Sequence, residues 1–136
     1  MKVQLTGALI KATKQSCGYD LSAEDDFIIH PKQNALIGTG VRLVQQEGLG
    51  ALVLPRSGLA KNKQVAMIGL IDTDYVNGHV IVNIINFSDE VMEIKKGDRI
   101  AQLAFVPFVN PEFIGGEVHY KNSERGDKGH GSTGVS

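Results

Sequence analysis

The sequence has few of the residues that build covalent cross-links or metal centres. Cys17 is its single cysteine, so no disulfide can form within the chain, and a lone thiol is typical of a reducing compartment. The four histidines are scattered, with no partners at the spacing of metal ligands, which argues against a zinc site. We therefore expect a cytoplasmic protein whose fold depends on neither disulfides nor zinc.

Basic residues are not in excess, and long apolar runs are missing. The chain has 14 Lys and Arg against 15 Asp and Glu, a net charge of −1, whereas a nucleic-acid-binding domain usually has a basic surplus. The apolar stretches are far shorter than the ~20 residues of a membrane-spanning helix, and the N-terminus lacks an apolar secretory segment. We expect no stable nucleic-acid binding and no membrane contact, and any polyanion that binds must be small.

Glycine is abundant, at 16 of 136 residues or about 12%, against a usual ~7%. Such a surplus fits many turns, or loops that bring backbone close to a ligand. Between the turns lie short runs rich in β-branched residues, which predict strands at 3–5, 27–29, 35–44, 49–54, 65–71, 80–86, 91–94 and 100–106.

A helix is expected only at 57–62, with Ser57 as the candidate N-cap. No amphipathic helix separates the strands, which disfavours a parallel α/β sheet. The pattern predicts one all-β domain, a sandwich or barrel, over 1–120, with a last strand near 113–120. Residues 121–136 have almost no apolar side chains, so this segment is either a tail or a lid that orders on a ligand.

Two segments in the first half of the chain set polar side chains beside glycine. In Cys17-Gly18-Tyr19-Asp20, the aspartate is either an ordinary turn residue or a carboxylate that holds Mg²⁺ through bound waters. Arg56, Ser57 and Gly58 open the expected helix, where backbone N–H groups and the arginine fork suit a phosphate. The alternative is a helix start with a surface arginine.

The central segment, Gly-Leu-Ile-Asp-Thr-Asp-Tyr at 69–75, precedes Asn77-Gly78, a strong hairpin signal. Carboxylates at a hairpin mouth can orient a water, and Tyr75 can stack on a flat ligand. The alternative is a pair of solvated turn acids and a half-buried tyrosine.

Two segments lie towards the C-terminus. Lys96-Gly97-Asp98-Arg99 enters a strand that contains Gln102, and alone it reads as a charged β-turn. The run at 125–134 contains glycines, hydroxyls and flanking cations, and such runs expose successive N–H groups to anions. Taken alone, such a glycine-rich run is more often a disordered tail. Its Arg-Gly-Asp triplet is also an adhesion motif, which no secretion signal supports.

Together and in this order, the five segments resemble the five sequence motifs of the trimeric dUTPases. The resemblance runs from about Val3 to Thr133 and rests on Pro-Arg-Ser-Gly-Leu-Ala at 55–60, Gly-Leu-Ile-Asp-x-Asp-Tyr at 69–75 and Gly-Asp-Arg-Ile-Ala-Gln-Leu at 97–103. It implies a homotrimer of β-jelly-roll chains with three active sites at subunit interfaces. It also implies Mg²⁺-dependent hydrolysis of dUTP to dUMP and pyrophosphate, which supplies the precursor of dTMP and keeps uracil out of DNA.

The resemblance assigns a role to each segment. Asp72 activates the attacking water, Asp20 supports the Mg²⁺ shell through water, and Tyr75 lies where a 2′-hydroxyl would have to fit. The substrate is otherwise held by residues of all three chains of the trimer: Arg56, Ser57, Gly58, Gly69, Ile71, Gln102, Arg125, His130, Gly131, Ser132 and Thr133. In this scheme Asp20, Arg56 and Gln102 come from one chain, the hairpin of Asp72 from a second, and the tail from the third.

Three positions depart from the family pattern. His130 stands where many members carry phenylalanine, the turn at 76–78 is one residue longer than usual, and Lys128 replaces a common glycine. None of them removes a catalytic group.

Two other functions compete with this one. A dCTP deaminase shares the trimeric fold but relies on a glutamate in the central hairpin, where this chain has Asp72 and Tyr75. A trimer of the same fold that serves as a nucleotide-sensing interaction module is the other alternative, and its partner surface would show no recognisable sequence motif.

Overall fold

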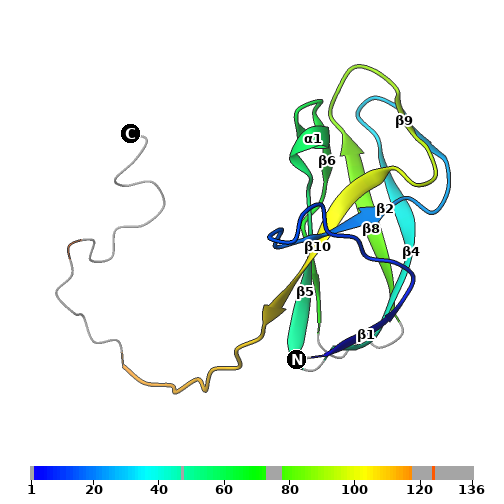
Figure 1. Cartoon of the computed structure of the whole chain (residues 1–136). Coiled ribbons are helices and arrows are strands. Elements are labelled where there is room, and N and C mark those ends of the chain that lie inside the picture. Colours follow the sequence, from blue (N-terminus) through cyan, green and yellow to red (C-terminus); the bar gives the residue numbers. More distant parts are fainter. Residues whose placement is uncertain (1, 47, 73–77, 118–123, 125–136) are drawn as a thin grey trace.

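The computed structural model describes residues 2–46, 48–72, 78–117 and 124. In this part the chain forms ten strands and one short helix (Figure 1). In chain order these are β1 (Val3–Thr6), β2 (Tyr19–Ser22), β3 (Phe27–Ile29), β4 (Asn34–Gln46), β5 (Leu49–Leu54), α1 (Ser57–Ala60), β6 (Gln64–Ala66), β7 (Gly69–Ile71), β8 (Gly78–Asn86), β9 (Met92–Ile94) and β10 (Arg99–Pro107).

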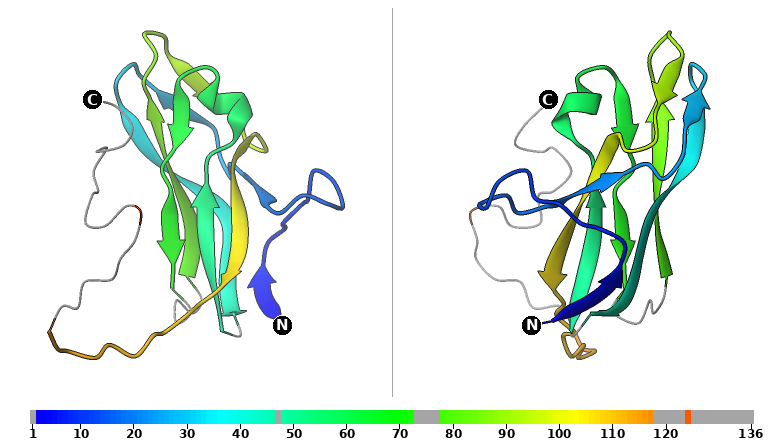
Figure 2. Two further views of the ribbon diagram at one scale, coloured as in Figure 1. Left: turned by 90° about the vertical axis from the view of Figure 1, so that its left-hand side faces the viewer. Right: turned by 45° about the vertical axis from the view of Figure 1, so that its right-hand side comes forward.

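The strands form two four-stranded antiparallel sheets and one small ribbon. One sheet has the order β1-β4-β8-β6, the other has the order β2-β10-β5-β7, and β3 pairs with β9. Figure 2 shows the two larger sheets as the layers of the molecule, with α1 at one end. The expectation of an all-β jelly-roll-like fold is confirmed.

The core lies between the two sheets because each strand turns alternate side chains inward. In β8, Val80, Val82 and Ile84 are fully buried, and Leu21, Val53 and Leu103 meet them from the other sheet. Ile29, Met92 and Ile94 of the β3–β9 ribbon belong to the same cluster. Each such side chain contributes roughly 1.5–3 kcal/mol by burial.

The structure differs from the sequence-based expectation in three places. β2 was not expected, because Gly18 indicated a turn. The run 65–71 is split into β6 and β7, which belong to different sheets, so the chain changes layer at Met67-Ile68. Residues 108–117 form no helix or strand and lead away from β10 (Figure 1), and the rest of the expected strand at 113–120 lies outside the described residues.

Candidate active site

Asp20 lies between two arginines. Its side chain is only 10% exposed, with Oδ1 at 3.3 Å from Arg56 Nε and Oδ2 at 3.4 Å from Arg99 Nη1. Arg56 Nη1 also donates a hydrogen bond of 3.1 Å to the carbonyl of Arg99. A buried carboxylate needs compensating charge, and these two guanidinium groups supply it.

Gln102 lies beside this ion cluster. It is opposite Asp20 in the β10–β2 pairing and opposite Leu54 in the β10–β5 pairing. Its Nε2 donates a hydrogen bond of 3.1 Å to the carbonyl of Pro55, just before Arg56. Gly18 packs against the same amide, because a Cβ atom at position 18 would lie 2.6 Å from Gln102 Oε1.

An irregularity in β10 brings Arg99 and Gln102 to the same face. Arg99 pairs with Ser22 and Gln102 with Asp20, so the register shifts between Arg99 and Ala101. In a regular strand, two residues three positions apart point to opposite faces of the sheet. A bulge inserts one extra residue between them, so that both point to the same face. Ile100 and Ala101 are both buried, as this bulge requires. The bulge therefore sets two polar side chains beside Asp20.

Ser57 and Gly58 are exposed at the start of α1. The expected N-cap was Ser57, but the N-cap is Arg56, with an extended backbone and no side-chain capping bond. Ser57 is thus the first helical residue. Because α1 has only four residues, its dipole is small, and the cationic character of this corner comes from Arg56 and Arg99.

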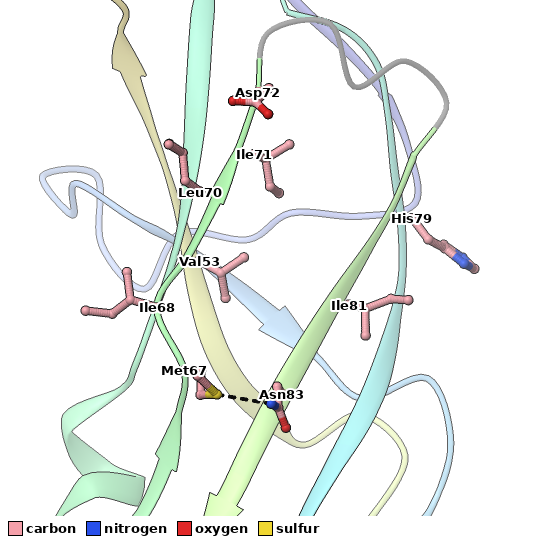
Figure 3. Close-up of a pocket in the computed structure, with 10 residues that line it drawn as sticks. Val53, Met67, Ile68, Leu70, Ile71, Asp72, His79, Ile81 and Asn83 are labelled. Atoms are coloured by element: carbon pink, nitrogen blue, oxygen red, sulfur yellow. Dashed lines mark hydrogen bonds between the residues drawn. The ribbon is translucent and has the colours of Figure 1, made fainter.

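Asp72 lies at the other end of the sheet, at the mouth of a pocket of about 530 Å³ between β7 and β8. Gly69, Ile71, Val53 and Ile81 also line this pocket (Figure 3). The two flanking strands belong to different sheets, which leaves the space between them. The pocket combines an apolar floor with an exposed carboxylate at its rim.

The strand register separates Asp72 from the ion cluster within one chain. Asp20, Gln102 and Leu54 share one level of the sheet, whereas Asp72 follows Ile71, which pairs with Ala51. Four residues along a strand span ~13 Å, and three strand spacings add ~14 Å sideways, so the main-chain positions of Asp20 and Asp72 are about 20 Å apart. The two groups do not form a single site in one chain.

Several expected site residues lie outside the described residues: Tyr75, Arg125, His130, Gly131, Ser132 and Thr133. Conversely, sequence reasoning gave no role to Arg99 or Gly18. The signal for Arg99 was the pair of apolar residues between two polar ones in Arg99-Ile100-Ala101-Gln102, which is the pattern of a bulge.

Within residues 2–46, 48–72, 78–117 and 124, no three His, Cys, Asp or Glu side chains gather so that they could hold a metal. Asp20 Oδ2 nevertheless has no hydrogen-bond donor although it is buried. It can therefore accept a bond from a metal-bound water, while the adjacent arginines disfavour direct coordination. In the same part of the chain, no helix is long and apolar enough to cross a membrane.

The arginine and amide cluster has the charge and the donors to suit an anion, and the separate pocket beside β7 is apolar enough to suit a flat group. Comparisons with known proteins identify the family. A model described as dUTPase matches residues 7–134. The deoxyuridine 5'-triphosphate nucleotidohydrolase of Nautilia profundicola is 43% identical over 132 residues, which cover 93% of this chain and 92% of that protein. The chain belongs to the dUTPase family.

Solved structures agree in fold. The Staphylococcus bacteriophage 80alpha dUTPase with dUPNHPP has a TM-score of 0.87 and 29% sequence identity, over 98% of this chain and 99% of that one. The phage phi11 dUTPase of S. aureus, a variant with a coordinated structural Mg(II) ion, has a TM-score of 0.78 and 24% identity, over 87% and 98% of the chains.

Proposed function

We propose that this protein hydrolyses dUTP to dUMP and pyrophosphate by attack of water on the α-phosphorus. The observation that carries the proposal is the Asp20–Arg56–Gln102 cluster in a chain that belongs to the dUTPase family. In the reaction, the water oxygen bonds to the α-phosphorus and the bond from that phosphorus to the bridging oxygen breaks. Pyrophosphate leaves with the bonding electrons, and Asp72 takes the proton of the water.

The roles follow from charge and hydrogen bonding. Arg56, Gln102 and the Ser57–Gly58 backbone hold the phosphate chain and stabilise the negative charge that grows on the leaving group. Arg56 donates one hydrogen bond to the carbonyl of Arg99, and its Nε forms an ion pair with Asp20, which leaves other N–H donors for a phosphate. In the segments outside the described residues, we assign sugar selection to Tyr75 and closure over the γ-phosphate and base to Arg125, His130, Gly131, Ser132 and Thr133.

The base is read at the pocket beside β7. This strand is the edge of its sheet, where its one strand partner among the described residues is β5. Gly69 and Ile71 line this pocket. The outward backbone groups of an edge strand suit the edge of uracil, and the apolar floor suits its faces. Cytosine reverses the donor and acceptor pattern, so it would leave buried groups without partners.

The residues of the cluster fit Mg²⁺ held mainly by the phosphates of the substrate. Asp20 would support it through a bound water, for which Oδ2 has the free acceptor position. When bound, the ion neutralises phosphate charge and so favours departure of pyrophosphate. A few local cations and this ion suffice to bind a polyanion, which is compatible with a net charge of −1.

We further propose a homotrimer with shared sites. The separation of about 20 Å between Asp20 and Asp72 supports it, because one chain cannot bring both groups to one phosphate. Exposed apolar residues support it as well: Ile68, Leu70 and Ile81 around the pocket, and Phe113 and Ile114 beyond β10, the last two about nine-tenths exposed. Such surfaces are typical of contacts between chains.

The test is pyrophosphate release from dUTP, dTTP, dCTP and UTP, each with Mg²⁺ and with EDTA. We expect rapid release from dUTP alone, and loss of that activity with EDTA. Ammonia from dCTP would instead identify a deaminase, and tight nucleotide binding without any product would identify a sensor.

A further inference from the structure

The carboxylate of Asp20 has two oxygens and a different cation at each. Arg56 Nε faces Oδ1 and Arg99 Nη1 faces Oδ2, while the carboxylate itself is nine-tenths buried. The Arg99 contact is an ion pair without hydrogen-bond geometry. Arg99 therefore interacts with Asp20 through its charge. This positive charge compensates the negative charge on Oδ2, the oxygen that Arg56 does not contact.

The backbone holds Arg99 in this place. Gly97, with φ of +91°, allows a tight turn before the strand, and its N–H donates to the carbonyl of Ala23 at 2.8 Å. The N–H of Ala23 donates in return to the carbonyl of Asp98 at 2.8 Å. These two bonds tie the turn to the end of β2, and the bulge that follows turns Arg99 towards Asp20.

We infer that Arg99 is a positioning residue for phosphate binding, acting on Arg56 through Asp20. Without Arg99, both carboxylate oxygens would depend on Arg56. The arginine fork would then bind the carboxylate with two N–H groups, because a bidentate pair is the favoured geometry. Those donors would be lost to the phosphate chain. The inference rests on the proposed function, since it concerns how Arg56 binds the phosphates of the proposed substrate.

The test compares Arg99→Gln with Lys96→Gln, which removes a positive charge from the same turn. We expect Arg99→Gln to raise the KM for dUTP about tenfold, within the range of coupling between contacting residues. The inhibition constant for deoxyuridine, which has no phosphate, should stay unchanged. Lys96→Gln should leave both constants within about twofold. Arg99→Lys, which restores the charge, should recover part of the loss.

A double-mutant cycle separates this role from a merely structural one. If Arg99 acts through Asp20, Arg99→Gln should add little to the effect of Asp20→Asn. Effects that multiply, or a KM for dUTP that Arg99→Gln does not change, would overturn the inference. If Arg99→Gln does not fold, the same double-mutant cycle can be made with Arg99→Lys. The KM for dUTP is then compared between Arg99→Lys, Asp20→Asn and the double variant. A wild-type protein that does not hydrolyse dUTP would instead overturn the proposed function.

Discussion

Among the described residues that line the pocket, Asp72 is the only carboxylate. We expect Asp72→Asn to keep the fold and to bind dUTP, because the amide has nearly the same shape and the position is exposed. Hydrolysis should fall at least ~100-fold, the usual scale for loss of a general base. Single-turnover assays measure this, with Asp89→Asn as a matched surface control, since Asp89 is 93% exposed and pairs with Lys32. Near-normal turnover would remove the catalytic role from Asp72.

Gly18 shows how a residue without a side chain can shape the site. A methyl group there would collide with Gln102 Oε1, which belongs to a flexible side chain, so the amide would move and the backbone would not. We expect Gly18→Ala to lower kcat/KM for dUTP about tenfold, with little change in unfolding. In a Gln102→Ala protein the same substitution should have a much smaller effect, because the amide is gone and only the contact with the Cβ of residue 102 remains. Equal effects in both backgrounds would place the role of Gly18 elsewhere.

At the scale of single residues, the sequence indicated candidate site residues but not how they are arranged. Arg56 and Gln102 could be named from their motifs, and they do lie side by side. The ion pairs of Asp20 could not be foreseen, because they depend on the bulge in β10 and on a strand, β2, that was read as a turn. The bulge in β10 and the strand β2 both result from pairing between residues far apart in the sequence, which composition and spacing do not encode.

Among the elements, strands with clear alternation and flanking turns were predicted with small errors. β5 was expected at 49–54 and spans Leu49–Leu54, β9 differs by one residue at its start, and β10 differs by one residue at each end. The run 65–71 was one exception, since its apolar residues are continuous while the chain passes from one sheet to the other. Continuous apolar sequence fits either layer, so it carries no signal for the change.

The β3–β9 ribbon is held to β8 by a buried asparagine. Asn86 Nδ2 donates to the carbonyls of Ile29 at 3.0 Å and Glu90 at 2.7 Å, and Oδ1 accepts from the N–H and hydroxyl of Ser88. We expect Asn86→Ala to reduce the free energy of unfolding by roughly 2–4 kcal/mol, because two carbonyls lose their donor. Urea unfolding at one protein concentration measures it. Asn62→Ala, at an exposed asparagine, should cost less than about 0.5 kcal/mol. Equal costs would show that the network does not stabilise the ribbon.

At the scale of the whole molecule, the positions of Asp20 and Asp72 pose a geometric problem. In the proposed reaction, a base must reach the water at the α-phosphorus while the arginine cluster holds the same phosphate chain. In one chain, however, ~20 Å separates the main-chain positions of Asp20 and Asp72. Binding nucleotide in one protomer would therefore leave either the base or the cations too far away. The proposed cyclic trimer would solve this, because a head-to-tail interface can join one end of a sheet to the opposite end of a neighbour.

This arrangement predicts that two inactive proteins restore activity when they share a trimer. Asp72→Asn lacks the base and Arg125→Ala lacks the proposed γ-phosphate contact, so each should be inactive alone. If the hairpin and the tail of a site come from different chains, every mixed trimer contains one site in which both are intact. Random mixing of equal amounts makes three quarters of the trimers mixed, so roughly a quarter of all sites should recover after co-refolding. The measurement is dUTP hydrolysis per chain, with native mass spectrometry to count mixed trimers and an unrefolded mixture as the control. Mixed trimers without recovered activity would mean that Asp72 and Arg125 of one site belong to the same chain.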